Sequence, residues 1–123
     1  MPSEPRQGSS APGRFRVLVV DDSPSIRRRV VQKLETFDFD ITEASSGEEA
    51  LDLTLDKTFD LVVSDIEMDA ITGVQLCRVF RGDPGMADIA FVLLTAAKEA
   101  KTRFWGRNAG ADIYLAKEHM DEK

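Results

Sequence analysis

The chain has 123 residues, of which 42% are hydrophobic and 31% are charged, and this balance predicts one globular domain with its own core. Its formal net charge of −6 argues against direct nucleic acid binding by this segment, because that function favours a basic surface. No apolar stretch approaches the roughly 20 residues of a membrane span, and the amino terminus lacks the apolar core of a secretory signal.

Short apolar runs alternate with amphipathic segments along most of the chain. Residues 1–14, rich in Pro, Ser and Gly, come first and predict a disordered leader before a domain at 15–123. The apolar runs predict five buried strands, at 15–20, 39–44, 61–63, 90–94 and 113–116. The segments between them predict four helices, at 24–36, about 47–56, about 73–80 and 98–108.

Local signals mark where the first two helices begin. Ser23 followed by Pro24 is typical of an N-cap with proline at the first helical position. Ser46 and Glu49 have the spacing of a capping box.

The first predicted helix has an apolar stripe and a basic run. The stripe, which is expected to face the core, consists of Ile26, Val30, Leu34 and Phe37. The basic residues lie largely off this stripe and predict a solvated face: Arg27, Arg28, Arg29 and Lys33. The only cysteine, Cys77, is expected to pack in the core, and a lone cysteine fits a reducing, cytoplasmic compartment.

Strands that are continuously apolar and alternate with helices predict a doubly wound α/β fold, with a parallel sheet covered by helices on both faces. In such sheets, ligands bind beyond the carboxyl ends of the strands. Polar residues follow four of the predicted strands: Asp21 and Asp22, then Asp65, Thr95 and Lys117. Solvent-exposed loops commonly begin with a polar residue after a buried strand, and this explains any one of them. It explains poorly why this whole chemical set occurs in this order.

This set of side chains is suited to phosphoryl chemistry. Clustered carboxylates resist ionisation unless a cation lies among them, and Mg²⁺ prefers such oxygen ligands. An aspartate carboxylate can attack phosphorus to give an aspartyl phosphate. The transfer then needs mainly positioning and charge neutralisation, which a bound Mg²⁺, an ammonium and a hydroxyl can supply.

Four segments carry a resemblance to a known family: VLVVDDSPSIRR (17–28), DLVVSDIEM (60–68), VLLTA (92–96) and GADIYLAK (110–117). Each is weak alone, but together, in this order and at these separations, they resemble the receiver domains of two-component response regulators. The resemblance runs from about Phe15 to Lys117. It implies a flavodoxin-like, five-stranded parallel sheet in the order 2-1-3-4-5.

The resemblance also implies a role for each site residue. Asp65 would be the phosphoacceptor, with Thr95 and Lys117 contacting the phosphoryl group. The Mg²⁺ ligands would be Asp21, Asp22, Asp65 and the backbone carbonyl of Glu67. Thr95 and Tyr114 would form the switch that changes on activation.

The family's known biology implies the partners. A sensor histidine kinase or phosphotransfer protein would donate the phosphoryl group, and an output domain or partner protein would respond. A homodimer is a further expected partner. The domain would be cytoplasmic. It would not be an enzyme, except that it would catalyse its own phosphorylation and autodephosphorylation.

The chain departs from the family pattern in three places. Glu118 follows Lys117 where the family usually has proline, and a non-proline cis bond costs about 2.5–4 kcal/mol, so a trans bond and a shifted Lys117 are expected. Asp69 replaces another usual proline, which predicts a more mobile loop. Only residues 118–123 follow the last strand, so the fifth helix is expected to be short or absent and the sheet partly uncovered.

Two alternatives to an active receiver are a pseudo-receiver and a phosphohydrolase. A pseudo-receiver, which would bind a partner without phosphorylation, stays open because of the Lys117–Glu118 step. A Mg²⁺-dependent phosphohydrolase would need an acid–base Asp two residues after its nucleophile, where Glu67 stands, and usually a cap domain.

Elsewhere, Phe104 and Trp105 predict a partner-facing surface on helix 98–108, and His119 is expected to be a surface residue.

Overall fold

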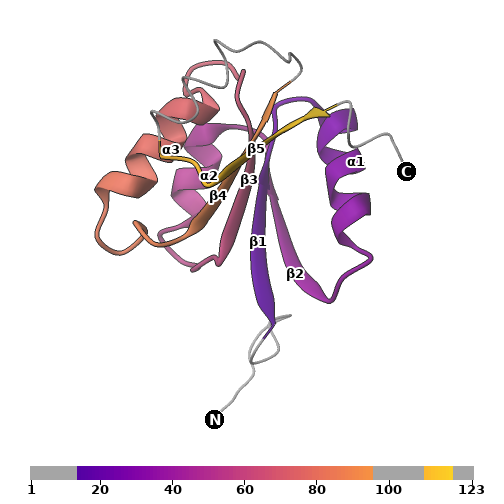
Figure 1. Cartoon of the computed structure of the whole chain (residues 1–123), viewed down its shortest axis with the longest axis horizontal. Helices are drawn as coiled ribbons and strands as arrows, with labels where there is room; N and C mark the ends of the chain where they lie inside the picture. The colour runs from indigo at the N-terminus through magenta and orange to yellow at the C-terminus, as the bar shows by residue number, and fades with distance from the viewer. Residues whose placement is uncertain (1–13, 96–109, 118–123) are drawn as a thin grey trace.

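The computed structural model describes residues 14–95 and 110–117 (Figure 1). The leader up to residue 13, helix 98–108 with its predicted docking surface, and the tail 118–123 with His119 lie outside the described residues. The same holds for the Lys117–Glu118 bond and the side chain of Tyr114.

Five strands form one parallel sheet in the order β2-β1-β3-β4-β5, which confirms the predicted topology. They are β1 Phe15–Val20, β2 Phe39–Ala44, β3 Leu61–Asp65, β4 Ala90–Thr95 and β5 Ile113–Ala116. Because all five strands run the same way, their carboxyl ends meet at one edge, where the predicted site residues follow them.

Three described helices cover the sheet: α1 Pro24–Leu34, α2 Gly47–Leu53 and α3 Gly73–Gly82. α1 lies on one face, while α2 and α3 lie on the other (Figure 1). The helix predicted at about 47–56 ends early because its last residues form turns with i→i−3 bonds, such as Leu55 N–H to the Asp52 carbonyl. None of the described helices is long and apolar enough to cross a membrane.

Side chains at the helix starts satisfy backbone N–H groups. The Ser23 hydroxyl accepts from the Ile26 N–H before α1, as predicted. At α2, Ser46 caps the Glu49 N–H as predicted, but the Glu49 carboxylate accepts from the Ser45 N–H at 2.7 Å. The predicted capping box is therefore only half formed, because Glu49 reaches one residue further back.

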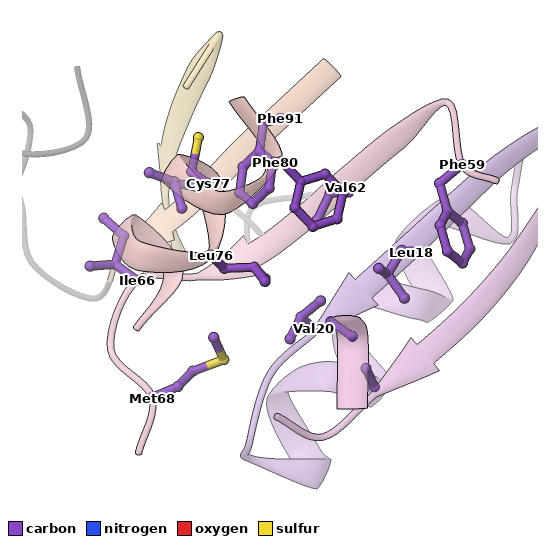
Figure 2. Close-up of a cluster of buried hydrophobic side chains, with 13 residues drawn as sticks. Leu18, Val20, Phe59, Val62, Ile66, Met68, Leu76, Cys77, Phe80 and Phe91 are labelled. Carbon is purple, nitrogen blue, oxygen red and sulfur yellow. The ribbon is translucent and has the colours of Figure 1, made fainter. Parts of the chain in front are cut away.

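The apolar residues fill two layers. Towards α2 and α3, the cluster in Figure 2 includes Leu18, Phe80 and Phe91, all fully buried. Cys77 belongs to the same cluster, as predicted, and burial raises the pKa of its thiol to about 11. The layer under α1 contains Val17, Val19, Val30, Val31, Val63 and Leu94.

Phe37 does not belong to the α1 stripe as predicted. It lies beyond the end of α1, its side chain is exposed, and its ring stacks on Phe39 at 5.2 Å between centroids. The helix ends at Leu34, before the periodic pattern reaches Phe37, and Val31 is the further α1 residue that is buried in the core.

On the α1 face, side-chain exposure rises across the sheet towards β5. The register places Val19, Val63, Val92 and Ile113 in one row across β1, β3, β4 and β5. Val19 is 1% exposed and Val63 is 7% exposed, whereas Ile113 is 53% exposed. α1 therefore covers the middle of the sheet but leaves apolar surface open at β5.

Candidate metal and phosphoryl site

Three carboxylates gather at the carboxyl edge of the sheet, as predicted. Asp21 and Asp22 directly follow β1, and Asp65 ends the neighbouring strand β3. One oxygen from each lies within 4.8 Å of the other two. Asp21 and Asp65 are buried, whereas Asp22 is exposed, so the cluster opens to solvent on one side.

Asp21 is held by hydrogen bonds at three of its polar groups. Its N–H donates to the Ala44 carbonyl at 3.1 Å, and its carbonyl accepts from Arg27 at 2.7 Å. Its Oδ1 accepts from the Ser23 N–H at 2.9 Å. The remaining oxygen, Oδ2, is buried and has no hydrogen-bond partner among the described residues. This arrangement directs an unsatisfied acceptor into the cluster.

Asp65 is held by the start of α3, which packs directly against it. A Cβ atom at Gly73 would overlap the carbonyl oxygen of Asp65 and lie 2.9 Å from its carbonyl carbon. Only glycine allows so close an approach. The Glu67 N–H lies 3.4 Å from Asp65 Oδ1. Gly73 was expected only as the first residue of a helix, so its part in the site was missed.

Lys117 contacts both buried carboxylates from the end of β5. Its Nζ lies 3.0 Å from Asp65 Oδ1 and 3.7 Å from Asp21 Oδ2. Thr95, which is buried, pairs in register with Ala116, the residue before Lys117. The structure therefore brings Lys117 to the carboxylates and places Thr95 on the same edge. The roles predicted for the Glu67 carbonyl and Tyr114 stay predictions.

Burial dominates the electrostatics of the site. Loss of solvent raises the pKa of the Asp65 carboxyl, while its bond to Lys117 opposes this effect and the charge on Asp21 adds to it. Burial likewise raises the pKa of Asp21, while the Ser23 N–H and the charge on Lys117 lower it. Both carboxylates are therefore poorly stabilised as anions by the protein alone.

The carboxylates and their surroundings fit a divalent cation with oxygen ligands. Asp21 Oδ2 has no hydrogen-bond partner among the described residues and only the Lys117 ammonium at 3.7 Å, so a cation in the cluster would supply further positive charge. The Asp22 carboxylate lies on the solvent-exposed side of the cluster, where its Oδ2 accepts a hydrogen bond from the Asp69 N–H at 3.3 Å. A proline at position 69 would have no N–H for this bond.

The fold and site together define a flavodoxin-like α/β domain with an acidic, lysine-bearing site at its carboxyl edge. A family model described as the response regulator receiver domain matches residues 17–123. The chain therefore belongs to the receiver domain family of two-component response regulators, and it is a signalling domain by that membership.

Curated relatives agree with this membership. The chain is 33% identical over 115 residues to a gliding motility regulatory protein of Myxococcus xanthus, covering 94% of this chain and 15% of that protein. It is 35% identical over 102 residues to the transcriptional regulatory protein ResD of Bacillus subtilis, covering 83% of this chain and 41% of the relative. The chain thus spans less than half the length of these relatives.

Solved structures show the same fold. Chemotaxis protein CheY4 of Vibrio cholerae superposes with a TM-score of 0.79 at 30% identity, covering 85% of this chain and 88% of that one. Response regulator TrrA of Thermotoga maritima, in complex with Mg²⁺–BeF, superposes with a TM-score of 0.73 at 35% identity, covering 83% and 85%.

Proposed function

We propose that this domain accepts a phosphoryl group on Asp65 from a sensor histidine kinase or phosphotransfer protein, with Mg²⁺ bound by Asp21, Asp22 and Asp65. One observation carries the proposal. Asp65 is a member of the carboxylate cluster that would hold Mg²⁺ and also lies 3.0 Å from Lys117, so it stands between the two positive charges that phosphoryl transfer would use.

The residues of the chain would act as follows. A carboxylate oxygen of Asp65 attacks phosphorus, and the bond from phosphorus to the donor nitrogen breaks, leaving its electron pair on the donor imidazole. The Lys117 ammonium neutralises charge on the phosphoryl oxygens, and the Thr95 hydroxyl donates a hydrogen bond to one of them. Asp21, Asp22 and Asp65 would hold Mg²⁺, which would supply further positive charge beside the phosphoryl group.

Incubation with acetyl phosphate and Mg²⁺ tests the proposal by mass spectrometry. We expect the mass gain of one phosphoryl group in the wild-type chain and its loss in Asp65→Asn. Asp88→Asn is the matched control, because this exposed carboxylate lies in the α3–β4 loop, away from the carboxyl edge. A mass gain that persists in Asp65→Asn would show that another residue is modified.

A pseudo-receiver remains the second candidate, because Glu118 stands where the family usually has proline beside Lys117. Such a domain would bind its partner without phosphorylation. Titration with beryllofluoride and Mg²⁺, the group present in the TrrA structure, separates the two candidates. An active receiver binds beryllofluoride only with Mg²⁺ and loses this binding in Asp65→Asn.

The proposed output is a change of shape that an output domain or partner protein recognises. The longer relatives, among them transcriptional regulators, support an output domain beyond the receiver. Thr95 and Tyr114 would carry the switch, and a homodimer would be one form of the response. The domain would act in the cytoplasm, and this segment would not contact nucleic acid directly.

A further inference from the structure

Arg27 differs from the other arginines of α1 in where its side chain lies. Arg28 and Arg29 are exposed, as a solvated basic face predicts. The Arg27 side chain is only 17% exposed, so the prediction of a solvated face was wrong at this position. Arg27 instead contacts the Asp21 backbone and Glu43 near the end of β2.

The guanidinium of Arg27 joins the ends of β1 and β2. Its Nη1 donates to the Asp21 carbonyl at 2.7 Å, and its Nε donates to Glu43 Oε1 at 2.9 Å. Glu43 directly precedes Ala44, whose carbonyl accepts the Asp21 N–H. The backbone of Asp21 is therefore tied to the end of β2 on both sides, directly at its N–H and through Arg27 at its carbonyl.

The Asp21 carbonyl belongs to the peptide unit that connects Asp21 to Asp22. Peptide units are planar, so fixing this carbonyl fixes the plane from which both acidic residues extend. A neutral donor would satisfy the carbonyl, but a guanidinium offers two donors in a rigid planar group. Two strands can therefore be held at once, with Glu43 setting the orientation of Arg27.

We propose that Arg27 is a positioning residue for the metal site, which aims the carboxylates of Asp21 and Asp22 by holding the peptide between them. This inference rests on the proposed function, because it assigns a role in Mg²⁺ binding at that site. Arg27 does not itself touch the metal. Residues that orient metal ligands in this way typically contribute 10- to 100-fold in affinity.

Charge and positioning predict opposite effects of removing Arg27. A cation near an acidic site repels Mg²⁺, so loss of the charge alone would tighten Mg²⁺ binding. Loss of positioning would weaken it, by roughly tenfold. Arg27→Lys separates the two further, because lysine keeps the charge but presents one ammonium in place of the planar fork.

Isothermal calorimetry with MgCl₂ alone tests the proposal on the full chain. We expect the Kd for Mg²⁺ to rise about tenfold in Arg27→Ala and by a smaller factor in Arg27→Lys. Arg28→Ala, which removes an exposed arginine one position along, should leave Kd within about twofold. Thermal unfolding in EDTA establishes that each variant is folded at the titration temperature; if Arg27→Ala is not, Arg27→Lys decides the test.

The outcomes distinguish the inference from the function on which it rests. If the wild-type chain binds Mg²⁺ but Arg27→Ala or Arg27→Lys binds equally well or more tightly, the positioning role is refuted and the proposed function stands. Lower melting temperatures with unchanged Kd would also refute it, since a merely structural role moves only stability. If the wild-type chain binds no Mg²⁺, the proposed function fails and takes this inference with it.

Discussion

The buried carboxylate of Asp21 should destabilise the domain when no metal is bound. Its Oδ2 is buried without a hydrogen-bond partner among the described residues, and burial raises its pKa. Asp21→Asn removes the charge while its amide oxygen can still accept from the Ser23 N–H. We therefore expect the variant to be more stable than the wild-type chain in EDTA at pH 7.

The expected magnitude is that of a single stabilising substitution, which commonly contributes about 0.5–2 kcal/mol. In a chain of this length, each 1 kcal/mol raises the melting temperature by roughly 4 °C. Saturating Mg²⁺ at about 100 times Kd adds about 2.7 kcal/mol to the wild-type protein, and less to a variant that binds it weakly. The difference in stability between Asp21→Asn and the wild-type chain should therefore become smaller, or change sign, when Mg²⁺ is added.

The pH dependence has a definite sign. A carboxyl whose pKa is raised by folding holds its proton in the folded state after the unfolded chain has lost it. Stability in EDTA should therefore fall as the pH rises from the ordinary Asp range through the raised folded-state pKa. Asp21→Asn should show a shallower fall, because Asp65 still contributes.

Thermal unfolding by circular dichroism, in EDTA and in MgCl₂, measures both effects. Asp88→Asn makes the same charge change at an exposed position and should shift the melting temperature little in either buffer. If Asp21→Asn proves less stable than the wild-type chain in EDTA at pH 7, the buried carboxylate does not destabilise the metal-free fold and the reasoning is refuted.

Two further predictions concern packing. Gly73→Ala should destabilise the fold by about 1–3 kcal/mol and weaken Mg²⁺ binding, because its Cβ would overlap the Asp65 carbonyl; Gly82→Ala, with open space at the other end of α3, is the control. Denaturant unfolding and calorimetry measure both, and equal stability of the two variants would contradict the close approach. Exposed Ile113 and Leu115 predict that the isolated 123-residue chain self-associates unless a longer parent covers them. Sedimentation should show this association, and a monomer at all concentrations would contradict it.

The sheet and most of the site could be predicted because they depend on local pattern. Continuous apolar runs identified the strands, and in a parallel sheet the residues that follow strands must meet at one edge. Asp21, Asp65 and Lys117 accordingly come together from three strands. Thr72 and Gln75 at the start of α3 also have the spacing of a capping box, and the structure forms it.

The remaining features depend on distances that no local pattern encodes. Gly73 is required because α3 begins against the Asp65 backbone, which only the path of the β3–α3 loop determines. Arg27 is indistinguishable from Arg28 in a charge run, and only its contacts with Glu43 on the neighbouring strand and with the Asp21 carbonyl set it apart. Phe37 continues a helical period, but the chain turns before reaching it.

The charges at the site indicate how the proposed phosphorylation would affect the position of β5. With all three carboxylates ionised, Lys117 offsets one negative charge and leaves two, which is the charge that one Mg²⁺ balances. Phosphorylation turns the Asp65 carboxylate into an acyl phosphate with two negative charges, so the site gains one negative charge. In the proposed phosphorylated state, Lys117 would exchange its 3.0 Å ion pair with Asp65 Oδ1 for bonds to phosphoryl oxygens. Because Lys117 directly follows Ala116, the end of β5, we expect this exchange to shift the strand that carries Tyr114 and the exposed Ile113 and Leu115. The proposed chemistry at the carboxyl edge would thus be connected, through Lys117, to the apolar surface that α1 leaves open.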